Sequence, residues 1–154
     1  MGVGDAFPDF DLPATGGKRI SLMMLRGRRV VFYFYPRDNT PGCTMEALAF
    51  AQSHDFLMQR NVLVYGVSRD SVASHERFKQ KLALPFDLLS DVQATLCSAT
   101  GVMKEKNMYG RRVMGIERTT FLVDEQGIIR HVWSKVRVEG HVAAVERAVD
   151  ALDS

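Results

Sequence analysis

One cysteine stands where a thiol can act as a nucleophile. The segment FYFYPRDNTPGCTMEAL contains an aromatic run that ends at Pro36, and a helical pattern begins close to Cys43. The thiolate, not the thiol, is the reactive form of cysteine. Unpaired N–H groups and the positive end of the dipole at the start of a helix both stabilise an anion. The position of Cys43 therefore favours an activated sulfur, and the alternative is a buried cysteine that acts as a small apolar side chain.

The residues before Cys43 support the reactive role. Thr40, Pro41 and Gly42 form a corner between a strand and a helix. Proline restricts the loop, and glycine lets the backbone come close to whatever lies beside the sulfur. Functional residues are often carried by loops that a rigid scaffold holds, so this corner is an unusual place for a packing cysteine.

The elements that must position these residues form an α/β pattern. Apolar, β-branched and aromatic runs predict strands at 29–35, 62–68, 119–124 and 128–136. Spacings of three and four residues predict helices at about 43–59, 71–82, 92–100 and 139–154. An N-terminal β-hairpin over 10–22 precedes them, and we expect Asp91 to cap the third helix. The order predicts an α/β fold with a central mixed β-sheet flanked by helices, in a single domain of residues 1–154.

Composition and charge exclude several classes of protein. Hydrophobic residues make up 46% and charged residues 25% of the 154 residues, and the net charge of +2 is too small to imply nucleic acid. No apolar run reaches the roughly 18 residues of a membrane span. The N-terminus lacks a secretory pattern, so we expect a cytoplasmic protein. The two cysteines make no disulfide framework and the four scattered histidines show no metal-ligand spacing, so we expect neither a metal nor a cofactor.

Pro36, Thr40 and Cys43 match the Pro-x-x-x-Thr-x-x-Cys motif of peroxiredoxins. The chain resembles the branch of that family known as bacterioferritin comigratory protein or peroxiredoxin Q. The segments GDAFPDFDL, LLSD and GIERTTFLVDEQGIIRHVW are also similar to it, so the resemblance covers most of the chain. It implies a thioredoxin-like fold and a thiol-dependent peroxidase that reduces hydrogen peroxide and organic hydroperoxides.

The resemblance also implies roles for single residues. Cys43 would be the peroxidatic cysteine, which attacks the O–O bond and becomes a sulfenic acid. Thr40 would offer its hydroxyl to the peroxide and the sulfur, and Arg118 would lie over the thiolate. Pro36 would shield the pocket from water, and Glu46 would help to orient Arg118. Taken alone, Arg118 also fits a surface ion pair or a sheet edge, and Thr40 fits a turn or a helix cap.

The chain departs from the family pattern in its second thiol. Leu48 stands where many relatives carry a resolving cysteine, and Lys79 lies about where others carry it in the following helix. Cys97 is the only other cysteine, and its small-residue helix face indicates close packing; a resolving role after local unfolding stays open. We expect a one-cysteine mechanism, in which thioredoxin, or glutathione with glutaredoxin, reduces the oxidised Cys43.

Residues 104–118 form a long polar segment that leads to Arg118. We expect a loop there, either as one wall of the pocket or simply in solvent. In the first case Met103, Met108, Met114 and Tyr109 would offer organic hydroperoxides an adaptable apolar surface.

Other functions fit the same fold less well. A thiol–disulfide oxidoreductase needs Cys-x-x-Cys, but Glu46 occupies the last position of that motif. A glutathione-peroxidase-like enzyme needs Gln and Trp partners, and the only Trp, Trp133, lies in the late hairpin. A redox sensor or holdase needs the same activated thiolate as a peroxidase, so it stays open. We expect a monomer or a small homodimer.

Overall fold

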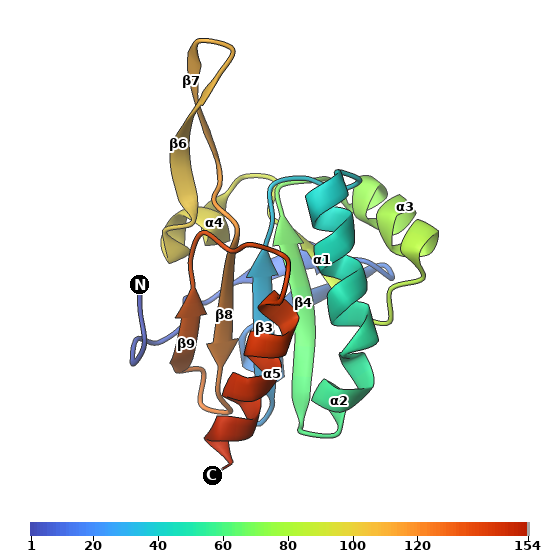
Figure 1. The fold of residues 1–154 in the computed structure, drawn as a ribbon, viewed down its shortest axis with the longest axis vertical. Helices are drawn as coiled ribbons and strands as arrows, with labels where there is room; N and C mark the ends of the chain where they lie inside the picture. Colours follow the sequence, from blue (N-terminus) through green and yellow to red (C-terminus); the bar gives the residue numbers. More distant parts are fainter. Residues whose placement is uncertain (154) are drawn as a thin grey trace.

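The computed structural model describes residues 1–153, and its centre is a seven-stranded mixed sheet of order β2-β1-β5-β4-β3-β8-β9 (Figure 1). The strands are β1 (Asp11–Ala14), β2 (Lys18–Ser21), β3 (Arg29–Phe34), β4 (Val62–Ser68), β5 (Asp87–Ser90), β6 (Met103–Met108), β7 (Arg111–Ile116), β8 (Thr119–Val123) and β9 (Ile129–Trp133). The helices are η1 (Met23–Leu25), α1 (Pro41–Gln52), α2 (His54–Met58), α3 (Val72–Leu82), α4 (Thr95–Thr100) and α5 (His141–Leu152). The predicted fold class and N-terminal hairpin are confirmed.

The central strand, β3, is buried on both faces. It pairs with β4 in parallel and with β8 in antiparallel orientation. Its side chains alternate between two cores, because successive residues of a strand point to opposite faces. Tyr33 and Tyr35 pack in the core that contains residues of α1, α2, α3 and α5. Phe32 and Phe34 pack in the other core, which contains residues of η1 and α4.

Two predictions of secondary structure were incomplete. The helix expected at 43–59 begins at Pro41 and is broken at Ser53 into α1 and α2. Proline suits the first turn of a helix because its missing N–H would have no partner there. The strand β5 was not predicted, since a run of four residues gives no reliable periodicity, and it forms by parallel pairing with β4.

The prediction of a loop over 104–118 was wrong. The segment forms an antiparallel hairpin of β6 and β7, which extends away from the main sheet (Figure 1). Tyr109 and Gly110 join the strands with φ of 53° and 77°, as in a tight two-residue hairpin turn. The charged residues hide the alternation that marks a strand. Met108 and Met114 are exposed on this hairpin, whereas Met103 packs against the core.

One predicted helix start agrees with the structure, and the other agrees only in the hydrogen bonds of its predicted cap, since the N-cap residue of α4 is Ala94. The Ser71 hydroxyl accepts a hydrogen bond from the N–H of Ser74 at the start of α3. The Asp91 carboxylate accepts hydrogen bonds from the N–H groups of Leu96 and Cys97 in α4, at 3.3 and 2.7 Å, although α4 begins later than expected. Among the described residues, no helix has both the length and the apolar character that a bilayer span requires.

Candidate active site

The sulfur of Cys43 lies in the first turn of α1, the helix that follows the carboxyl end of β3. The first helical hydrogen bond runs from the N–H of Thr44 to the carbonyl of Thr40, so the N–H groups of Gly42 and Cys43 precede the helical ladder. Cys43 is only 1% exposed and packs against the core with Tyr33 and Tyr35. The predicted position at a helix start is confirmed.

Arg118 reaches this sulfur because of the way β8 pairs with β3. Thr119 lies opposite Phe34, which brings the preceding residue to the end of the sheet where α1 begins. Nη2 of Arg118 lies 3.3 Å from Sγ of Cys43. The guanidinium therefore donates a hydrogen bond to the sulfur.

Gly42 makes the close approach of Arg118 possible. A Cβ atom on residue 42 would lie 3.3 Å from Nη2 of Arg118, which is tighter than ordinary van der Waals contact. The structure thus agrees with the expectation that this glycine leaves room for a group beside the sulfur.

Glu46 lies one turn after Cys43 and holds the other end of the guanidinium. Its Oε1 accepts a hydrogen bond from Nη1 of Arg118 at 2.6 Å. Burial raises the pKa of Glu46 to about 7, although Arg118 acts in the opposite direction. The second oxygen, Oε2, is buried without a hydrogen-bond partner among the described residues, and so is the hydroxyl of Tyr33. Arg118 therefore spans the sulfur of Cys43 and a carboxyl group whose pKa lies near neutrality.

Thr40 and Pro36 lie in the loop between β3 and α1. Thr40 is the N-cap residue of α1 in an extended conformation, and its hydroxyl donates to the carbonyl of Arg37 at 3.0 Å instead of capping the helix. The lone pairs of this hydroxyl are still available to accept a hydrogen bond. Pro36 is exposed, and its shielding role stays a prediction.

Cys97 lies on the other side of the sheet from Cys43. Its side chain belongs to the core with Phe32 and Phe34, and both cysteines are free thiols. Burial, together with the neighbouring Asp91, raises the pKa of Cys97 far above its usual value, which disfavours a reactive thiolate.

Leu48 and Lys79 occupy the two positions at which the family resemblance led us to look for a resolving cysteine. Leu48 is 39% exposed on α1. Lys79 forms an ion pair with Asp87 at 2.7 Å.

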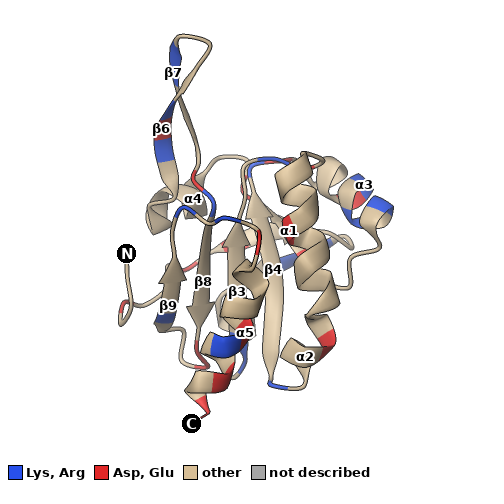
Figure 2. Ribbon diagram, in the orientation of Figure 1, with Lys and Arg blue, Asp and Glu red and all other residues tan. Residues whose placement is uncertain are grey.

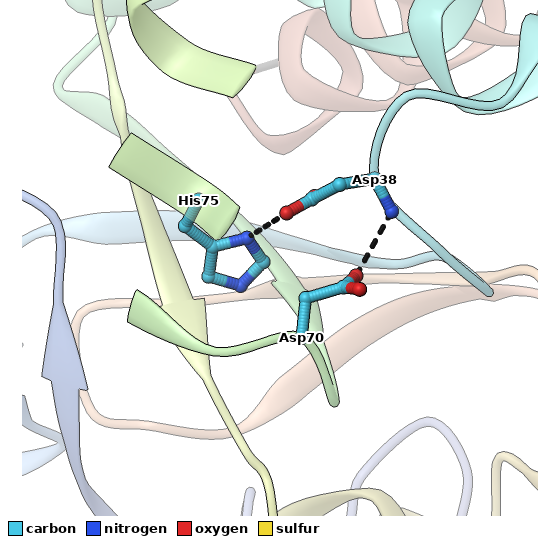
Figure 3. A group of neighbouring side chains, drawn as sticks. All are labelled: Asp38, Asp70 and His75. Atoms are coloured by element: carbon cyan, nitrogen blue, oxygen red, sulfur yellow. Dashed lines mark hydrogen bonds and ion pairs between the residues drawn. The ribbon is translucent and has the colours of Figure 1, made fainter. Parts of the chain in front are cut away.

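A largely buried polar cluster beside the loop before α1 was not predicted from the sequence. Asp38, Asp70 and His75 bring ligand-type atoms within 4.8 Å of one another, the one such group of three or more among residues 1–153 (Figure 3). Nothing in the spacing of these residues points to their contact, because they come from the loop before α1, the segment after β4 and α3.

A second buried histidine was also missed. His141 at the start of α5 lies 2.8 Å from the hydroxyl of Thr120, through Nε2. Burial, with a contribution from Arg118, lowers the pKa of His141 to about 4.

A family model described as the AhpC/TSA family matches residues 3–132. The chain therefore belongs to the AhpC/TSA family. A putative peroxiredoxin Bcp of Coxiella burnetii is 52% identical over 143 residues, which are 93% of this chain and 95% of the relative.

Solved structures are similar as well. A cysteine mutant of Xylella fastidiosa PrxQ has a TM-score of 0.95 at 40% identity, with 100% of this chain and 98% of that chain covered. Bacterioferritin comigratory protein of Xanthomonas campestris, studied for alkyl peroxide reduction, has a TM-score of 0.90 at 43% identity, with coverage of 94% and 92%. The predicted resemblance to the Bcp or peroxiredoxin Q branch and the thioredoxin-like fold are confirmed.

Proposed function

We propose that this protein is a thiol peroxidase in which Cys43 is the peroxidatic residue, reducing hydrogen peroxide and organic hydroperoxides. The observation that carries the proposal is the position of Arg118, which contacts the sulfur with Nη2 and Glu46 with Nη1. The related Xanthomonas protein is described by its alkyl peroxide reduction, which supports the same chemistry here.

The proposed step is a displacement at oxygen. The Cys43 thiolate attacks the terminal oxygen of the hydroperoxide, an S–O bond forms, and the O–O bond breaks. The electron pair of that bond goes to the leaving oxygen, which takes up the proton of the attacked hydroperoxide and departs as water or alcohol. Donors placed in advance stabilise the charge that develops on the oxygens, and this is the role we assign to Arg118 and the hydroxyl of Thr40.

Stopped-flow oxidation tests this assignment. Wild type, Cys43→Ser and Cys97→Ser are mixed with hydrogen peroxide and with an alkyl hydroperoxide. We expect Cys43→Ser to lose the reaction and Cys97→Ser to keep the first oxidation step. Rapid reaction of Cys43→Ser would refute the assignment. Steady-state turnover with a donor thiol separates a peroxidase from a redox sensor or holdase, which would be oxidised without sustained turnover.

We also propose a one-cysteine mechanism with an external reductant. The packing of Cys43 and Cys97 in cores on opposite faces of the sheet supports it. A disulfide needs Cα atoms within about 7 Å, and side chains on opposite faces meet only after local unfolding. Oxidation with one equivalent of peroxide, followed by mass-spectrometric mapping of thiols, should give Cys43 sulfenic acid as the main product. A Cys43–Cys97 disulfide as the main product would contradict the mechanism.

For the reductant, we propose a small anionic thiol of the glutathione type. A polar groove of about 700 Å³ lies beside Thr40, and its charged lining consists of the basic Arg37, Arg77 and Lys81 and the acidic Asp38 and Asp70. Figure 2 shows the basic residues of α3 and of the loop before α1. Among the described residues, Arg37 and Arg77 form no ion pair closer than 4.0 Å, so both guanidinium groups can attract the carboxylates of such a thiol.

Turnover of Arg77→Glu tests the groove, with Arg147→Glu on the exposed side of α5 as the matched control. We expect kcat/KM for glutathione to fall roughly tenfold in Arg77→Glu, because a charge is reversed, and to change little for the uncharged 2-mercaptoethanol. An unchanged kcat/KM for glutathione would contradict the proposed reductant. If only thioredoxin supports turnover, the electron donor is thioredoxin and not glutathione.

A further inference from the structure

His75 is a fully buried histidine whose two ring nitrogens both face oxygen atoms. Nε2 lies 3.0 Å from the carbonyl oxygen of Leu89, and Nδ1 lies 2.7 Å from Oδ2 of Asp38. A carbonyl oxygen only accepts hydrogen bonds, so Nε2 must carry a proton. An ionised carboxylate also only accepts, so Nδ1 must carry a proton as well, provided that Asp38 is ionised.

The surroundings of Asp38 indicate that it is ionised. The hydroxyl of Tyr35 donates to Oδ1 at 2.6 Å, and the hydroxyl of Ser74 donates to Oδ2 at 2.8 Å. Burial by itself would raise the pKa of Asp38, and the hydroxyl donors Tyr35 and Ser74, whose hydrogen bonds do not depend on the charge of His75, act in the opposite direction. A carboxylate that accepts several hydrogen bonds favours its charged form. The pair is therefore a buried imidazolium and carboxylate.

The cluster does not need a metal ion to satisfy its polar atoms. Both nitrogens of His75 are occupied by acceptors, and the Oδ2 atom of Asp70 accepts hydrogen bonds from the N–H of Asp38 at 2.9 Å and from the hydroxyl of Ser68 at 2.6 Å (Figure 3). A metal would have to displace a proton from a ring nitrogen that already balances a buried carboxylate. Both ring nitrogens of His75 are thus used within the network and neither is free to bind a metal ion.

This network ties the loop that carries Thr40 to three neighbouring elements. Asp38 belongs to the loop, His75 to α3 and Leu89 to β5. Asp70, which follows β4, holds the N–H of Asp38. Thr40, the N-cap residue of α1, lies two residues after Asp38. A shift of Asp38 therefore moves the start of the helix.

The loop also needs to be held. Asn39 has a φ of 62°, a conformation that is costly for most residues without a contact that maintains it. The hydroxyl of Thr40 is fixed on the carbonyl of Arg37, the residue immediately before Asp38. The position of the hydroxyl thus depends on where Asp38 is anchored.

We propose that His75, as a buried imidazolium, is a positioning residue of the peroxidase site: its ion pair with Asp38 holds the loop so that Thr40 and the first turn of α1 face the peroxide correctly. The proposal rests on the proposed function, since it concerns the rate at which Cys43 reacts. Removal of one partner leaves the other charge buried and uncompensated, which displaces the loop or draws in water.

Nitrogen-15 NMR of the reduced wild-type protein at pH 7 tests the charge state directly. We expect both ring nitrogens of His75 to carry protons, while half-exposed His54 on α2 serves as the reference histidine. A neutral His75 ring would overturn the proposal, and so would a change in its resonances when Zn²⁺ is added at stoichiometric amounts. This measurement uses the wild-type protein, so it tests the charge state of His75 even if variants at these positions fail to fold.

Peroxide kinetics test the positioning role. In His75→Gln and Asp38→Asn we expect the second-order rate constant for oxidation of Cys43 to fall roughly ten- to a hundredfold, as small misplacements of reacting groups do. The double variant should recover part of the rate, because two amides can pair without a buried charge. Gln80→Ala, at an exposed position of the same helix, is the matched control, and its rate should stay within about twofold.

Alkylation of Cys43 by iodoacetamide separates positioning from thiolate formation. We expect the alkylation rate to change much less than the peroxide rate, since iodoacetamide does not need the hydroxyl of Thr40. Equal losses in both reactions, or no loss in either, would overturn the proposal. If wild type itself does not react with peroxide, the proposed function fails instead, so the two failures are distinguishable.

Discussion

Replacement of Glu46 by glutamine should change how stability depends on pH. Burial raises the pKa of this carboxyl from its usual 4.5 to about 7, because it is fully enclosed beside Cys43 and Arg118. Between these values the folded protein keeps a proton that the unfolded chain releases. The stability that protonated Glu46 contributes is therefore complete below about pH 4.5 and is lost as the pH rises through about 7. A difference of about 2.5 in pKa corresponds to about 3 kcal/mol.

The wild-type curve alone would hide this effect. The pKa of His141 is lowered to about 4, so its contribution to stability is present above about pH 6.5 and is lost as the pH falls through about 4. The slopes of Glu46 and His141 are opposite over most of this range. The comparison must therefore be the difference between wild type and variant at each pH.

The assay is urea denaturation of reduced wild type and Glu46→Gln between pH 4.5 and 8. The amide of the variant keeps an oxygen for Arg118 but cannot ionise. We expect the free energy of unfolding of wild type, relative to the variant, to fall by about 3 kcal/mol from the acidic to the alkaline end. Glu139→Gln, at an exposed position before α5, is the control and should shift stability by less than about 0.5 kcal/mol at any pH. A constant difference between wild type and Glu46→Gln across this range would refute the reasoning.

Three further changes probe the same site. Gly42→Ala should leave the urea midpoint unchanged or slightly higher, since alanine favours a helix. Stopped-flow oxidation of Cys43 should become slower, because the new Cβ, 3.3 Å from Nη2 of Arg118, displaces the guanidinium. An unchanged rate would show that the position of Arg118 does not depend on a glycine at residue 42. Arg118→Lys should slow oxidation roughly a hundredfold in the same assay, because a lysine cannot contact both Cys43 and Glu46 as a planar fork does, and a rate within twofold of wild type would contradict this. Wild type should lose about 3 kcal/mol more unfolding free energy than His141→Gln when the pH falls from 6.5 to 4, as measured by urea denaturation. An equal loss of stability in both proteins would count against the assigned pKa of about 4.

The parts of the fold that were predicted correctly carry their signal within a few residues. The run at 62–68 became β4 with the same bounds, and Ser71 caps α3 as its sequence context indicates. The hairpin of β6 and β7 was missed because charged residues on both faces conceal the alternation of a strand. The strand β5 was missed because it is too short to show a period and depends on its partner β4.

The sequence by itself determined the chemistry that is available: a cysteine at a helix start, the hydroxyl of Thr40 before it, and an arginine ahead of a late strand. Only the tertiary structure decided which groups meet. Arg118 contacts Cys43 across 75 positions of sequence, and His75 contacts Asp38 across 37. It also decided that Cys43 and Cys97 pack on opposite faces of the sheet. The physical reason is that local signals fix the direction of a side chain within its own element, whereas contacts between distant elements follow from the order and pairing of the strands.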